Sequence, residues 1–144
     1  MNRSEKIREK LGSKIISWEE KRDKRIYFSI AKEHIFKTVE FLFKELGLRF
    51  SIASGVDTPA GLEILYHFSD DKSGLVYSVR VMIEDKKHPE IDSVTPLFSG
   101  AEWIEREMWE LLGIKFKGHP NLKRLLLAED WPEGNYPLRH KDES

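Results

Sequence analysis

Residues 100–126 read GAEWIEREMWELLGIKFKGHPNLKRLL, and the first half of this stretch predicts a helix. A glycine at position 113 is typical of the residue just past a helix C-terminus, so we expect the helix to end there. One face of this helix is apolar at the spacing that packs against a core, and it comprises Ala101, Ile104, Met108, Leu111 and Leu112.

The opposite face carries a tryptophan among charged side chains: Trp103, Arg106, Glu107 and Glu110. A face turned only toward water needs no large aromatic, whereas Trp and Arg are the residues that most often anchor protein interfaces. We therefore expect this face to contact another protein. An internal ion pair between Arg106 and Glu107 fits the sequence equally well. Both interpretations are correct if that ion pair lies at the edge of the interface with the other protein.

The second half of the stretch contains Gly118, His119 and Pro120, after which a short helix could begin and run to Leu126. We expect His119 to bond backbone groups of this loop. Lys115, Lys117, Lys123 and Arg124 form a local basic cluster around it. On a chain of net charge −1, such a cluster favours a solvated or partner-facing patch over a nucleic-acid site.

Upstream of residue 100 the pattern alternates between helices and hairpins. Helices are expected over residues 2–11, with Ser4 as N-cap and Gly12 as the stop, and over residues 32–46. In the second helix only Phe41 falls off the apolar stripe, so we expect its side chain to be exposed. Strands are expected over residues 15–19, 25–30, 48–56, 62–68 and 77–83, and residues 84–92 read as a charged loop. In the strand over residues 48–56, an apolar set alternates with a second set: Leu48, Phe50 and Ile52 against Arg49, Ser51 and Ala53. This order predicts an α+β fold in two layers, with a mostly antiparallel or mixed sheet of about five strands packed with helices.

The domain organisation follows from the same pattern. Residues 1–128 are expected to form a single domain, since 144 residues suffice for one hydrophobic core. Residues 129–144 show no periodicity and predict an extended tail that docks on a partner through Trp131, Tyr136, Leu138 and Arg139.

Composition excludes several classes of protein. The chain has no cysteine, which rules out disulfides, a thiolate nucleophile and Cys-ligated zinc or iron–sulfur clusters. Its start lacks the apolar segment of a signal peptide, and no run approaches the roughly 18 apolar residues of a membrane span, so we expect a cytoplasmic protein. Charged residues make up 34% of the chain and glutamine is absent, which is a composition typical of thermophiles.

Enzymatic chemistry has little support in the spacing of residues. No H-x-x-x-H or H-E-x-x-H pattern occurs, and no glycine-rich phosphate loop, so NADH or flavin binding is not expected. The alternative worth keeping is an independent metal-dependent domain that uses Glu105 or Glu107 with His119. Glu105 and Glu107 diverge by about 200° on a helix, which argues against that site.

The same residues carry a resemblance to a known family. The run from Trp103 to Glu107, with Glu110, Gly113, Phe116, the Gly118-His119-Pro120 turn and Arg124, resembles the signature of the family of the NADH–quinone oxidoreductase C subunit. This family comprises the thirty-kilodalton subunit of respiratory complex I and homologous subunits of membrane-bound, energy-converting hydrogenases. Glu133-Gly134 and Pro137-Leu138-Arg139 are also similar to the tail of the family.

The resemblance implies a non-catalytic subunit, without cofactor or small-molecule substrate, in the peripheral, cytoplasm-facing arm of a membrane-bound oxidoreductase complex. It implies docking on the hydrogenase-like large subunit, next to the iron–sulfur subunit. The shortness of the chain is more similar to members from membrane-bound hydrogenases or sulfur-reducing complexes than to those from a full NADH dehydrogenase. A free-standing adaptor outside any redox complex is the second alternative.

Overall fold

The computed structural model describes residues 2–22, 24–122, 132 and 134–140. A five-stranded sheet forms its centre, built from β1 (Ile15–Lys21), β2 (Arg25–Ile30), β3 (Arg49–Thr58), β4 (Gly61–Ser69) and β5 (Val76–Ile83). The strand order is β1-β2-β5-β4-β3, with β2 and β5 parallel and all other neighbours antiparallel. The predicted α+β fold with a mixed five-stranded sheet is confirmed.

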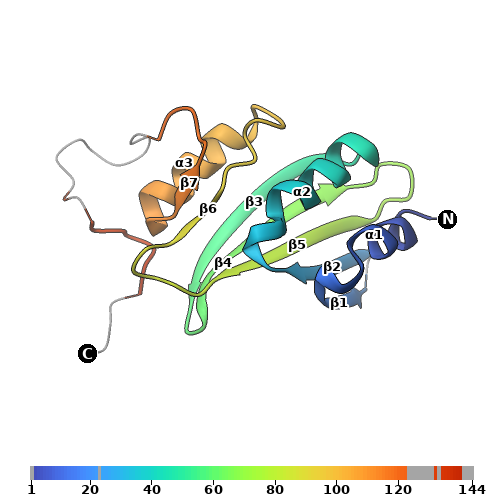
Figure 1. The fold of residues 1–144 in the computed structure, drawn as a ribbon, viewed down its shortest axis with the longest axis horizontal. Helices are drawn as coiled ribbons and strands as arrows, with labels where there is room; N and C mark the ends of the chain where they lie inside the picture. The colour runs from blue at the N-terminus through green and yellow to red at the C-terminus, as the bar shows by residue number, and fades with distance from the viewer. Residues whose placement is uncertain (1, 23, 123–131, 133, 141–144) are drawn as a thin grey trace.

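Helices cover one face of this sheet. Figure 1 shows α1 (Arg3–Leu11) and α2 (Ile35–Glu40) over that face, with α3 (Ala101–Leu112) beside β3. Alternate strand residues point toward the helices and are fully buried, among them Phe28, Tyr66, Phe68 and Tyr77. The hydrophobic core therefore lies between the sheet and the helices, in two layers.

The predicted helix over residues 32–46 is present but is not uniform. A 3₁₀ turn (Lys32–His34) leads into α2, and a π-helical turn (Phe41–Glu45) ends it. The prediction that Phe41 is exposed is wrong, since the side chain is only 8% exposed. The π turn shifts the angular spacing of the residues, and α1 covers the ring, with Lys10 Nζ 5.8 Å from its centroid.

Two further local predictions need correction. The N-cap of α1 is Asn2, whose side chain accepts from the Glu5 N–H at 2.8 Å, and not Ser4, whose hydroxyl pairs with Tyr77 Oη at 2.8 Å. In β3 a bulge lies between Phe50 and Ile52. An extra residue in a strand reverses which side chains face the core, so Ala53 is buried while Ile52 is 53% exposed.

The expected charged loop over residues 84–92 contains a strand that the sequence did not predict. β6 (Glu90–Asp92) pairs in parallel with β7 (Lys115–Lys117) to form a small second sheet. This pairing is possible because α3 lies between the two strands in sequence and acts as their crossover connection. As a result, residues 93–95 are held beside α3.

Candidate interaction surface

α3 packs against β3 at a close approach next to Gly55. A Cβ on Gly55 would lie 2.7 Å from Leu112 Cδ1 and 3.2 Å from Met108 Sδ. Met108 and Leu112 belong to the predicted apolar face and are buried, while Ile104 and Leu111 are half-buried beside them. The helix ends at Gly113, which adopts φ 80° as the sequence predicted.

The charged face of α3 divides into exposed and buried residues. Trp103 is 57% exposed and Glu107 is exposed, in keeping with a contact surface. Arg106 and Glu110 are buried in this domain, at 5% and 4% exposed. The Arg106 guanidinium lies 5.0 Å from the centroid of the Trp103 ring. The buried arginine thus makes a cation–π contact with the exposed tryptophan.

Glu105 is an interior acceptor whose role the sequence did not reveal. Its carboxylate is 1% exposed and accepts from Ser93 Oγ, from the Val94 N–H at 2.9 Å and from Thr95 Oγ1 at 2.7 Å. Burial raises the pKa of Glu105, and these three hydrogen bonds offset part of that rise. The carboxylate fastens the loop after β6 to α3.

His119 has both ring nitrogens engaged, as expected for a loop-supporting histidine. Nε2 donates to the Glu102 carbonyl at 3.0 Å, and Nδ1 accepts from the Asn121 N–H at 2.9 Å. Glu105 already accepts three hydrogen bonds, and Glu107 is exposed on α3. These two carboxylates and His119 therefore do not point toward a common metal position. Across the described part of the chain, no three His, Asp or Glu side chains are placed to hold a metal ion.

The tail described at residues 134–140 folds back onto its own domain. Tyr136 covers Gly113, where an added Cβ would lie 2.5 Å from the ring. The Leu138 N–H donates to the Leu111 carbonyl at 3.0 Å, and Arg139 donates to the carbonyls of Leu112 at 2.7 Å and Lys86 at 2.8 Å. Arg139 thus caps the C-terminus of α3, where a cation is favoured.

Asp57 anchors the last described part of this tail. It accepts from the His140 N–H at 2.8 Å and pairs with Lys86 Nζ at 2.6 Å. Burial alone would raise the pKa of Asp57, but the Lys86 ammonium and the His140 N–H outweigh burial and hold this pKa below its usual value.

The remaining predicted interface residues are distributed as follows. Pro120 is exposed at the end of the His119 loop, and Leu138 is 54% exposed although its backbone is bonded to α3. Arg124 and Trp131 lie outside the described residues. The predicted short helix from Pro120 to Leu126 also falls largely outside them.

Exposed apolar side chains gather around α3 and β3. Ile52, Val56, Trp103 and Leu138 are each at least half exposed. A groove of about 190 Å³ lies next to Ile52 and Leu138, and it is lined by residues 52–55 of β3, by Leu138 and by five residues of α3: Ile104, Glu107, Met108, Leu111 and Leu112. Sequence reasoning missed Ile52 and Val56, because the bulge in β3 turns outward side chains that simple alternation places in the core.

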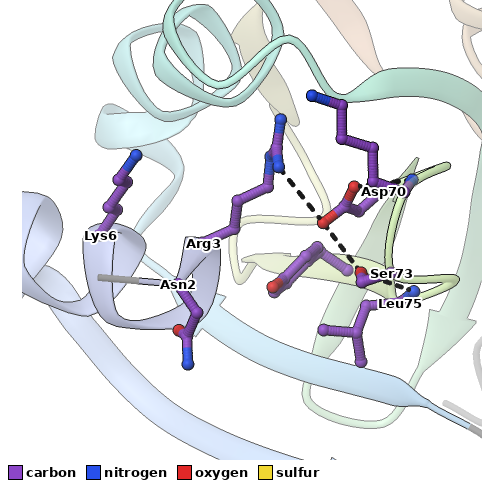
Figure 2. Close-up of a pocket in the computed structure, with 8 residues that line it drawn as sticks. Asn2, Arg3, Lys6, Asp70, Ser73 and Leu75 are labelled. Atoms are coloured by element: carbon purple, nitrogen blue, oxygen red, sulfur yellow. Dashed lines mark hydrogen bonds and ion pairs between the residues drawn. The ribbon is translucent and has the colours of Figure 1, made fainter.

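A second hollow, of about 290 Å³, lies at the start of α1. Figure 2 shows Arg3 and Asp70 pointing toward one another across it, with Ser73 bonded to Asp70. Arg3 also donates to the Leu46 carbonyl at 3.1 Å. The Arg3 guanidinium therefore already has an ion-pair partner and a hydrogen-bond acceptor within the chain. Its contact with Asp70 links α1 to the turn between β4 and β5.

The comparison with protein families gives a match over most of the chain. The sequence profile of the family described as the respiratory-chain NADH dehydrogenase, 30 Kd subunit, matches residues 28–143. This range begins inside β2 and includes the rest of the sheet that follows it in sequence, α3 and the docked tail. None of the described helices has the length and hydrophobicity needed to span a bilayer.

Curated relatives and a solved structure resemble the chain. The C/D subunit of NADH-quinone oxidoreductase from Bacteroides thetaiotaomicron is 34% identical over 106 residues, covering 72% of this chain and 20% of the relative. The C subunit of F(420)H(2) dehydrogenase from Methanosarcina mazei is 42% identical over 88 residues, covering 60% of this chain and 54% of the relative. The chain thus spans from a fifth to about half of the length of these relatives.

The solved structure is the membrane-bound sulfane sulfur reductase, described as an archaeal respiratory membrane complex. One of its chains superposes with a TM-score of 0.79 at 22% identity, covering 94% of this chain and 81% of that chain. At this identity the likeness concerns the fold, and it extends over nearly the whole length of this chain.

Proposed function

Because this chain belongs to the family of the respiratory-chain NADH dehydrogenase 30 Kd subunit, we propose that it is a non-catalytic structural subunit in the peripheral arm of a complex I-like, membrane-bound oxidoreductase. The observation that carries the proposal is the family match over residues 28–143. It includes α3 and the tail, where the exposed Trp103 and Leu138 lie. The chain itself binds no cofactor and no small-molecule substrate in this account.

The partner of the chain is the hydrogenase-like large subunit, with the iron–sulfur subunit alongside it. Support comes from the relatives named as C/D subunits, in which the matched region is only 20% of a longer chain. Fusing a C module and a D module in one chain keeps them at a high effective concentration. Such a fusion can function only if the contact surfaces of the two modules can reach one another. The role of the chain is to hold the electron-transferring subunits in register, so electrons pass through its partners.

The site residues proposed for this contact are those that the fold presents outward or supports from within. Trp103, Glu107, Pro120 and Leu138 are exposed and can touch the partner directly. A supporting role falls to the buried or half-buried members of the set, as Arg106 has beside the Trp103 ring: Arg106, Glu110, His119, Tyr136 and Arg139. Arg124 and Trp131 remain proposed contacts outside the described residues.

The complex faces the cytoplasm in this proposal, and the chain reaches the membrane only through its partners. The names of the relatives include an NADH-quinone oxidoreductase and an F(420)H(2) dehydrogenase, so electron donors differ among them.

A tagged copy of the chain, purified from gently solubilised native membranes and analysed by mass spectrometry, tests the proposal. Stoichiometric recovery of a hydrogenase-like large subunit with an iron–sulfur subunit is the expected result. A Trp103→Ala variant should recover at least tenfold less of the large subunit, because truncating a central aromatic anchor costs about 1.4 kcal/mol or more. Recovery of the chain alone, in the soluble fraction, would contradict the proposal.

A further inference from the structure

The free edge of β3 carries no charge or proline over residues 51–56, and its protection is confined to the bulge after Phe50 and to Arg49 and Asp57 near its ends. Within the part of the chain that the structure describes, β3 is the last strand of the sheet and pairs with β4 alone. Residues 51–56 read SIASGV, without charge or proline. Edge strands usually carry charges, prolines or short lengths, because unpaired backbone groups recruit other strands. The opposite edge strand, β1, has such protection in Glu19, Glu20 and Lys21.

The groove beside β3 runs along the backbone of the strand. Four consecutive residues, 52–55, line it. Side chains of consecutive strand residues point to opposite faces, so the surface that all four share is the edge of the strand. The facing wall is α3, with positions 104, 107, 108 and 111 on one stripe, and Leu138 closes the groove.

The groove is mostly apolar and contains one charged side chain. Ile52, Ile104, Met108, Leu111, Leu112 and Leu138 line it, and Glu107 is the acidic side chain among them. Glu107 is exposed and has no ion-pair partner within the described part of the chain. A ligand that fits this groove therefore needs apolar side chains and a cation opposite Glu107.

We propose that an extended segment of the partner subunit lies in this groove along the edge of β3, with apolar side chains against Ile52 and Leu138 and a Lys or Arg against Glu107. This proposal rests on the proposed function, because it takes the partner to be the large subunit of the complex. Strand addition to an exposed sheet edge is a common way to bind a peptide, with the backbone giving affinity and the side-chain pockets giving specificity.

The tail of the chain presents one wall of this groove. Arg139 and the Leu138 N–H bond the carbonyls of Leu112 and Leu111, which fixes the Leu138 side chain beside the C-terminal half of α3. The exposed Leu138 is thereby oriented by its own backbone before the partner arrives. Such preorganisation lowers the entropy that association costs.

Matched isoleucines on the two edges of the sheet provide the binding test. Ile52 on β3 is 53% exposed and Ile16 on β1 is 70% exposed. The full chain is co-expressed with the large subunit, and recovery of the large subunit is measured for wild type, Ile52→Lys, Ile16→Lys and Glu107→Lys. Ile52→Lys and Glu107→Lys should lower recovery at least tenfold, while Ile16→Lys leaves it unchanged.

Circular dichroism of each variant alone excludes unfolding as the cause of a loss. Glu107→Lys, on an exposed helix position, remains informative if Ile52→Lys fails to fold. Recovery that is unaffected by both substitutions, while wild type binds the large subunit, overturns the groove proposal and leaves the proposed function standing. If wild type itself recovers no large subunit, the proposed function fails and the groove proposal fails with it.

The lack of cysteine allows the occupant of the groove to be identified by cross-linking. Ser54→Cys on β3 and Ser17→Cys on β1 introduce one thiol each, at exposed positions on opposite edges. With a thiol-to-amine reagent of short reach, the Ser54→Cys chain should cross-link to an extended peptide of the large subunit and the Ser17→Cys chain should not. A cross-link to a second copy of this chain, to a helical peptide, or equally from both positions, overturns the proposal.

Discussion

Glu105 shows how a single side chain at the interaction surface stabilises the fold instead of performing chemistry. Its three donors come from consecutive residues of the loop after β6. In Glu105→Ala these donors lose their acceptor in a buried place, which should lower the free energy of unfolding by about 3 kcal/mol. Glu105→Gln keeps one acceptor oxygen and should lose less, as measured by urea denaturation. Equal stability of Glu105→Ala and wild type would contradict this role.

Asp57 should make the free energy of unfolding depend on pH in the acidic range. The pKa of Asp57 is lower in the folded chain than in the unfolded chain, so the stabilisation that it provides is present above its unfolded pKa and is lost as pH falls through the folded pKa. In Asp57→Asn, stability should decline less steeply between about pH 5 and pH 2. Thermal unfolding across this range, with wild type in parallel, measures the difference. Superimposable pH profiles would show that Asp57 does not contribute.

The side chains of α3 mark the limit of what the sequence could predict about single residues. Its apolar stripe and the Gly113 stop were predicted correctly, because they follow from helical periodicity and backbone preference. The burial of Glu110 was not predicted, and an internal Arg106 was one of two readings that the sequence left open. Periodicity describes a helix with one covered face, whereas α3 contacts β3, β7 and the docked tail. The interface roles of the individual residues remain predictions.

At the scale of elements, the junction between α3 and the tail depends on one glycine. Gly113 has φ 80°, and a Cβ there would overlap the Tyr136 ring. Gly113→Ala should therefore lower the free energy of unfolding by about 1–2 kcal/mol for the left-handed backbone and should loosen the tail. Gly100→Ala is a matched control, since Gly100 has φ −60° and no atom lies within 4 Å of the added Cβ.

Thermal unfolding and limited proteolysis check both consequences at this junction. The tail of Gly113→Ala should be cut after Arg139 faster than the tail of wild type or Gly100→Ala. The same midpoint and the same rate of cutting for all three chains would show that the Tyr136 contact does not hold the tail.

Element prediction succeeded where hydrophobic periodicity was strong and failed where it was short. The five main strands and the three helices were predicted from alternation and helical spacing, with small errors at the ends. β6 and β7, of three residues each, have too few residues for a pattern and are stabilised by their pairing across α3. The bulge in β3 and the π turn after α2 each shift the register by a residue, which no period reveals.

At the scale of the whole molecule, the composition makes a prediction about heat stability. Charged residues are 34% of the chain and glutamine is absent, which is typical of proteins from thermophiles. The midpoint of thermal unfolding should exceed the 45–65 °C that is usual for mesophile domains, by roughly ten degrees or more. Differential scanning calorimetry measures this midpoint. A value inside the mesophile range would contradict the prediction.

The family was predicted correctly from the sequence, because its signature lies in α3 and the loop that follows it, and the profile match confirms it. The docking groove could not be predicted in this way. It depends on the bulge of β3, on the close approach at Gly55 and on the tail that returns to Leu111. These contacts join residues that are far apart in the sequence and have no local signal.

The most direct test of the structural role is deletion of the chain from its native cell, followed by native gel analysis of the solubilised membranes. We predict that the large subunit and the iron–sulfur subunit no longer migrate with the membrane arm, and that the oxidoreductase activity of the membranes is lost. Re-expression of the wild-type chain should restore both, and the Ile16→Lys chain should do so equally well. A complex that assembles and stays active without this chain would contradict the account.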